Sequence, residues 1–256
     1  MKLKHLPILL CLTLCISLAT AQKPEKVRIK TEKGRDGISK IKYQVLRSDK
    51  KIKHGFYKQF NTYYNQLVVS GTYKYGKKDG LWEEWITNSD NLKSKGYYKN
   101  GIKVGVWEYM DFLKRPLHTY NHDTNTLIFD SSCGKNYPRN ILLNGKKVYK
   151  ELDCVPSLLG GTYSLSNDLY FSYLLTNSND ENTSAFNVDI SILINKDGDV
   201  VEIEANGTNL SKEFYAILEK KINNPEFVWL PGKLNGKKVD AYVVLKSVVS
   251  SYQTSD

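Results

Sequence analysis

The sequence is poor in residues that would form a rigid spacer, a zinc site or a second membrane span. It has seven prolines in 256 residues, and the six that follow the N-terminal leader are scattered, so no stiff proline-rich stretch is expected. It has four cysteines but no Cys-x-x-Cys pair, the usual spacing of zinc ligands. After residue 21 no apolar run approaches the roughly 17 to 25 residues of a spanning helix, so we expect that part to be soluble.

Sequence motifs of catalysis are also missing. The chain has no Gly-x-Ser-x-Gly nucleophile elbow and no glycine-rich loop that would cradle a phosphate. His118 and His122 are four residues apart, but the glutamate of a His-Glu-x-x-His motif is absent and the local pattern is typical of a turn. We therefore predict a protein that is not an enzyme and uses no metal or cofactor. The alternative is a hydrolase that acts on wall polymers through an unfamiliar set of residues.

The N-terminus has the pattern of a secretory signal peptide. Positive charge in residues 1–5 precedes an almost wholly apolar stretch, residues 6–18, and an Ala-x-Ala cleavage site that ends at Ala21. Cys11 and Cys15 each follow leucine, so lipoprotein processing is not expected. Cleavage would leave an exported, periplasmic protein. The alternative is a leader that is retained as an inner-membrane anchor, with the rest of the chain facing the periplasm.

Two cysteines, Cys133 and Cys154, follow the leader. Two thiols in an oxidising compartment indicate a disulfide. The alternative is a pair of free thiols in separate elements, because sequence spacing does not fix the distance between the two Cβ atoms.

Positive charge is concentrated just after the leader. The net charge is +10, and residues 22–58 hold thirteen Lys and Arg against four Asp and Glu, a balance of +9. Such a segment suits an anionic membrane surface or a cell-wall polymer. The alternative is the solvated face of strands, since apolar residues 41, 43 and 45 alternate with polar ones. No nucleic-acid partner is expected, because the chain has no nucleic-acid-binding motif.

A repeat of 25 residues organises the middle of the chain. Glycine followed by an apolar and an aromatic residue recurs at Gly55, Gly80 and Gly105, and a second glycine recurs in phase at Gly71 and Gly96. We expect two short strands in each unit, with the glycines adopting positive φ in turns and the aromatic residues filling the core. Over about residues 51–120 these segments resemble variant MORN repeats, a resemblance that implies a β-meander used for contacts with proteins or membranes.

The aromatic residues of the repeat also admit a sharper interpretation. A row of outward-facing rings would indicate a stacking surface for a sugar or peptide. Burial at alternating positions would indicate the core of a thin sheet. The residues concerned are Tyr73, Trp82, Trp85, Tyr97, Tyr98 and Trp107.

The last hundred residues combine helical and strand patterns. Residues 165–175 and 210–222 have the apolar spacing of helices, whereas residues 188–194, 200–205 and 239–249 have the apolar–polar alternation of half-buried strands. Asp-Gly at 197 and Asn-Gly at 235 are turn signals. The expected order is strand, strand, helix, strand, with a preceding helix.

This order is similar to that of the TonB C-terminal domain, across roughly residues 155–249. The resemblance also rests on Trp229, Pro231, Gly232, Asn235 and Gly236, each of which has a local folding role as a core plug, strand break or turn. It implies that the last strand captures an extended peptide of an envelope protein by strand addition. The residues expected at this edge are Val239, Ala241, Tyr242, Val243, Val244 and Leu245.

The sequence thus predicts an α+β protein, with an N-terminal β-meander of MORN-like hairpins followed by a small TonB-like domain. The expected segments are the signal peptide 1–21, a basic and partly stranded segment 22–50, the repeat meander 51–120, a linking β segment 121–154 and the C-terminal domain 155–256. The expected function is non-catalytic binding to proteins or other components of the envelope. The alternative is a short TonB-like energy transducer, anchored by an uncleaved leader and serving outer-membrane transport.

Overall fold

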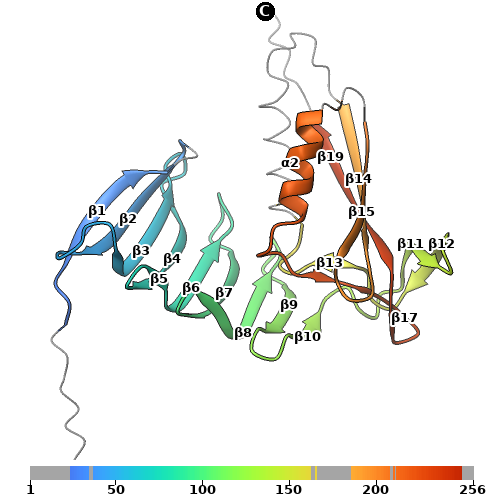
Figure 1. Cartoon of the computed structure of the whole chain (residues 1–256), viewed down its shortest axis with the longest axis horizontal. Coiled ribbons are helices and arrows are strands. Elements are labelled where there is room, and N and C mark those ends of the chain that lie inside the picture. The colour runs from blue at the N-terminus through green and yellow to red at the C-terminus, as the bar shows by residue number, and fades with distance from the viewer. Residues whose placement is uncertain are drawn as a thin grey trace, which may run out of the picture.

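The computed structural model of the chain describes residues 24–34, 37–162, 165, 186–207, 210 and 212–249. Most of these residues form antiparallel sheets, and among them there is one complete helix, α2 (Lys212–Ile222). The expected signal peptide and, apart from Leu165, the expected helix 165–175 lie outside the described residues. Figure 1 shows a long row of hairpins from the N-terminal half, followed by a second sheet with α2 on one of its faces.

The N-terminal half forms one ten-stranded antiparallel sheet. Its order is that of the chain, β1-β2-β3-β4-β6-β7-β8-β9-β10, with the short β5 paired to β4. The expected β-meander is therefore present, and it extends beyond the repeat at both ends. Its strands are β1 (Val27–Lys33), β2 (Ser39–Leu46), β3 (Lys53–Asn61), β4 (Gln66–Lys74), β5 (Lys77–Lys78), β6 (Gly80–Trp85), β7 (Leu92–Lys99), β8 (Ile102–Met110), β9 (Pro116–Asn121) and β10 (Thr126–Asp130).

The two sets of repeat glycines have different roles. Gly55, Gly80 and Gly105 have the expected positive φ, of 100°, 83° and 63°, but Gly55 and Gly105 lie inside β3 and β8 at register irregularities and not in turns. The expectation of positive φ was wrong for Gly71 and Gly96, which lie inside β4 and β7. These two glycines leave room for indole rings. A Cβ would lie 2.3 Å from the ring of Trp82 at Gly71 and 2.2 Å from that of Trp107 at Gly96.

Each of these tryptophans is a core residue of the meander. Trp82 is 3% exposed and Trp107 is 2% exposed. Their indole N–H groups donate to the backbone carbonyls of Thr72 and Tyr97, both at 3.1 Å. The tryptophans therefore fill the sheet's core, whereas Tyr97 projects from the opposite, exposed face.

Three lysines at equivalent repeat positions, Lys53, Lys78 and Lys103, cover the buried rings. The ammonium nitrogens of Lys78 and Lys103 lie 4.5 Å from the ring centroids of Trp82 and Trp107. Lys53 lies in the same way over tyrosine rings. These cation–π contacts stack along the sheet, so each repeat supplies its own cover for its aromatic core.

A second, five-stranded antiparallel sheet has the order β12-β11-β19-β14-β15. The expected sequence of strand, strand, helix, strand is present as β14, β15, α2 and β19. The sheet also takes two strands from the expected linking segment. The remaining strands are β11 (Tyr137–Leu143), β12 (Lys146–Leu152), β13 (Ser157–Leu158), β14 (Phe186–Ile194), β15 (Val200–Asn206), β16 (Trp229–Leu230), β17 (Gly232–Leu234), β18 (Lys237–Val239) and β19 (Ala241–Val249), with β13 paired to β16 and β17 to β18.

The apolar face of α2 packs against this sheet. Phe214, Leu218 and Ile222 are buried in one cluster with alternate residues of β14 and β19 and with Trp229. The indole N–H of Trp229 donates to the carbonyl of Ile222 at 3.3 Å, so it satisfies one of the carbonyls left open at the helix end. Helix 210–222 was thus correctly expected from its apolar spacing, although its expected cap positions, residues 209 and 211, lie outside the described residues.

The expected disulfide between Cys133 and Cys154 is confirmed. Cys133 lies in the loop that follows β10, and the carbonyl of Cys154 accepts a hydrogen bond from the backbone N–H of Lys233 at 2.9 Å. The disulfide therefore ties the end of the long sheet to β17 of the C-terminal part.

Candidate functional site

Strand β19 is paired along its whole length on one side only. On that side it pairs with β14, from Ala241 opposite Ile194 to Val249 opposite Phe186. On the other side β11 pairs with it at one position, Ile141 opposite Ala241. Within the described ranges, no strand pairs with this side of β19 beyond that position. We call residues 243–249 on this side the free edge.

The pairing with β11 shows which backbone groups face the free edge. The N–H of Leu142 donates to the carbonyl of Asp240 at 2.9 Å, so the polar groups of Asp240 point toward β11. Backbone groups of successive strand residues point to alternate sides. The N–H and C=O of Val244, Lys246 and Val248 therefore point to the free edge. Those of the intervening residues point to β14.

Packing on both faces of the sheet fixes this orientation. Val243 and Leu245 are buried against α2. On the opposite face, the hydroxyl of Tyr242 donates to the carboxylate of Glu202 at 3.1 Å, and the ammonium of Lys147 lies 4.2 Å from the centroid of its ring. A one-residue slip of β19 would expose the buried side chains, so the groups that face outward are firmly specified.

The expected edge residues divide into three groups. Val239 is not on β19, because it lies in β18 opposite Gly232. Ala241 is paired on both sides. Of the others, Val244 is the residue whose backbone groups face the free edge beyond the β11 contact, and its side chain is 42% exposed.

The residues expected to define the fold lie beside β19 rather than on it. Trp229 belongs to β16, and Asn235 and Gly236, with φ of 52° and 74°, form the tight turn between β17 and β18. A Cβ on Gly232 would lie 3.0 Å from the Cβ of Ala241, so the glycine allows this hairpin to approach the start of β19. Pro231 separates β16 from β17.

A cleft of about 440 Å³ lies between the end of the long sheet and the segment 228–231. Its walls combine apolar side chains, such as Leu127 and Leu230, with the charged side chains of Asp197 and Lys233. In the described part of the chain, no three His, Cys, Asp or Glu side chains gather as metal ligands would.

His118 lies close to Ser157 and to Asp130, which lines this cleft, but the three do not form a catalytic relay. Nδ1 of His118 accepts the backbone N–H of Gly160 at 3.2 Å. Nε2 faces both the hydroxyl of Ser157, at 3.3 Å, and a carboxylate oxygen of Asp130, at 3.7 Å. A relay needs the serine and the carboxylate on opposite nitrogens. This buried imidazole instead joins β9 to β13 and to the segment that follows β13.

We expect acid to weaken this junction. Burial lowers the pKa of His118, and the nearby Asp130 charge opposes this only partly. Burial and then Lys103 lower the pKa of His122 to about 4. The unfolded chain therefore binds protons that the folded chain does not, so stability falls as the pH drops from about 6.5 toward 4.

Urea unfolding at a series of pH values would measure this effect. His118→Gln should reduce the slope of stability against pH, whatever it does to stability at pH 7.5. An unchanged slope would show that His118 does not contribute.

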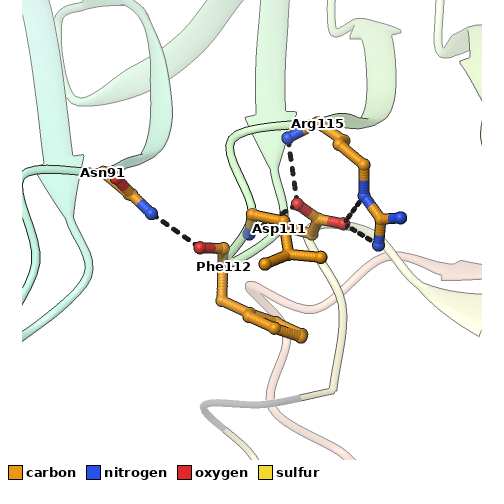
Figure 2. Close-up of polar contacts among 5 residues, drawn as sticks. Asn91, Asp111, Phe112 and Arg115 are labelled. Carbon is orange, nitrogen blue, oxygen red and sulfur yellow. Dashed lines mark hydrogen bonds and ion pairs between the residues drawn. The ribbon is translucent and has the colours of Figure 1, made fainter.

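A separate exposed rim is formed by hairpin tips of the meander. Phe112, 64% exposed, lies at the tip between β8 and β9. The carboxylate of Asp111 accepts the backbone N–H groups of Leu113 and Arg115 at 2.8 and 2.9 Å and also binds the Arg115 guanidinium. The Asn91 side chain, from the neighbouring tip, donates to the carbonyl of Phe112 at 2.6 Å. Figure 2 shows the Phe112 ring pointing away from this network, so the tip is braced while its ring stays outside.

Comparison of the chain with protein-family models and with curated proteins found no match. Among the described residues, no helix has the length and apolar character needed to cross a membrane.

Proposed function

We propose that this chain is a non-catalytic binding protein of the cell envelope that captures an extended segment of a partner protein along the free edge of β19. The observation that carries the proposal is the unequal pairing of β19, complete toward β14 and limited to one position toward β11. Unpaired strand edges are templates for an added strand, whose main-chain hydrogen bonds replace those to water.

Two further features support the proposal. The expected signal peptide and the disulfide between Cys133 and Cys154 suit an exported protein in an oxidising compartment. The order β14, β15, α2, β19 agrees with the resemblance to the TonB C-terminal domain, which implies strand addition at the last strand. The MORN-like meander would supply a second contact surface.

Val244→Pro tests the proposal. Proline removes the N–H of Val244, which faces the free edge, while the ladder to β14 keeps its hydrogen bonds because the polar groups of Val244 point away from that strand. Peptides of ten residues would be selected against the unchanged protein from a displayed random library. We expect their affinity to fall by about tenfold or more in the variant, equivalent to the loss of roughly 1.4 kcal/mol of binding free energy.

Val201→Pro is the matched control. Val201 lies on β15, at the other edge of the same sheet, is 60% exposed and occupies an irregular step in the β14–β15 ladder. Proline is tolerated at such sites. Equal affinity of both variants for the selected peptides, with both folded by circular dichroism, would reject the free edge as the binding site.

A further inference from the structure

The ladder between β11 and β19 stops soon after it begins. Ile141 lies opposite Ala241, and the next hydrogen bond joins Leu142 to Asp240. If this antiparallel register continued, each residue further along β19 would lie opposite a residue one position earlier on β11. Pro138, three residues before Ile141, would then lie opposite Val244, three residues after Ala241. In Figure 1 the β11–β12 hairpin lies beside the start of β19.

The hairpin geometry shows which way the nitrogen of Pro138 faces. Asn144 and Gly145 form a two-residue turn, so the flanking pair Leu143 and Lys146 is a hydrogen-bonded pair. The odd-numbered residues of β11 therefore bond to β12, and the even-numbered residues face β19. The bond from Leu142 to β19 agrees with this alternation. Pro138 thus removes no hydrogen bond from the β11–β12 ladder, because its missing N–H lies on the β19 side.

The carbonyl of Pro138 is occupied as well. It accepts a hydrogen bond from the guanidinium of Arg139 at 2.8 Å. Arg139 also lies over the ring of Tyr137, with its guanidinium carbon 5.9 Å from the centroid. Pro138 therefore offers Val244 no N–H donor, and the Arg139 guanidinium competes for its carbonyl oxygen. A pair at this position would normally exchange two hydrogen bonds, one in each direction.

We propose that Pro138 and Arg139 prevent the β11–β19 ladder, which includes only the pair Ile141 and Ala241, from extending to Val244, and so keep the free edge open for the partner strand. This inference rests on the proposed function and assigns the partner's position and direction. Since every described strand pair of this sheet is antiparallel, the partner runs antiparallel to β19. Its C-terminal end then stops next to Pro138, because β11 already covers Ala241.

The partner's chemistry follows from the same register. Residues directly opposite each other on two strands place their side chains on the same face. The partner residue opposite Val244 therefore lies beside an apolar, partly exposed side chain. A β-branched or aromatic residue fits that position best, whereas a charged residue would be desolvated without a counterion.

A double variant that should extend β11 along the free edge tests this assignment without any ligand. Pro138→Val combined with Arg139→Met supplies the missing N–H and releases the carbonyl, so β11 should extend its pairing to Val244. Hydrogen exchange followed by NMR should then show the backbone amides of residues 138 and 244 exchanging at least about tenfold more slowly than unpaired amides. Arg139→Met alone is the control, since it frees the carbonyl but adds no donor, and its Val244 amide should stay less protected.

The two proposals fail in distinguishable ways. Fast exchange of the Val244 amide in the double variant would overturn the role of Pro138, whether or not any peptide binds. If that amide becomes protected while the affinity for the selected peptides stays unchanged, the role of Pro138 stands and the free edge is not the binding site. A loss of affinity of about tenfold together with protection supports both.

Discussion

Gly96→Ala is expected to destabilise the repeat meander strongly. The new Cβ would lie 2.2 Å from the ring of Trp107, well inside the roughly 3.5 to 4.0 Å of a normal carbon–carbon contact. The ring has little freedom to move, because it is buried and its N–H is bonded to the carbonyl of Tyr97. Overpacking of a core typically costs about 1 to 3 kcal/mol, and we expect the upper end of this range.

Urea unfolding followed by tryptophan fluorescence would measure the loss, and Gly71→Ala should behave alike because of Trp82. Trp107→Leu provides the control. The smaller side chain should itself be destabilising, but adding Gly96→Ala to it should cost much less than in the unchanged protein. An equal cost in both backgrounds would mean that the ring is not what the alanine meets.

Loss of the disulfide between Cys133 and Cys154 should have the next largest effect on stability. The bond closes a loop with a sequence separation of 21 residues, for which chain entropy gives about 3 kcal/mol. Cys133→Ser with Cys154→Ser, or a reducing agent on the unchanged protein, should therefore lower the melting temperature by several degrees. The reducing agent should have no further effect on the double variant.

Ser132→Ala is a control from the same loop. The hydroxyl of Ser132 is buried and has no hydrogen-bond partner among the described residues, so its removal should be neutral or slightly stabilising. A double cysteine variant as stable as this control would show that the loop is held by its backbone contacts and not by the disulfide.

Local patterns in the sequence predicted much of the fold. The 25-residue spacing predicted the meander, apolar spacing predicted α2, and Asn-Gly at 235 predicted a tight turn. These features depend on neighbouring residues and so are visible in a single chain. The role of Gly71 and Gly96 was missed, because each meets a tryptophan eleven residues away across paired strands.

The free edge of β19 was predicted only in outline. The expected strand began at Val239, but Val239 pairs with Gly232, and the polar groups that face outward follow from the contact between Leu142 and Asp240. That contact joins segments about a hundred residues apart, and no local pattern specifies it. Pro138 could be located in the sequence, yet its importance depends on the register of β11 against β19.

The lysines over the buried rings recur once in each repeat unit of the long sheet. Lys78 covers a ring four residues later and also lies 4.8 Å from the centroid of Tyr98, which is twenty residues later. Lys53 has the same two relations, with Tyr57 and Tyr73. Insertion of one 25-residue unit would bring its own lysine and rings and so repeat both relations. The long sheet can therefore be lengthened or shortened by whole units without changing the order of the second sheet.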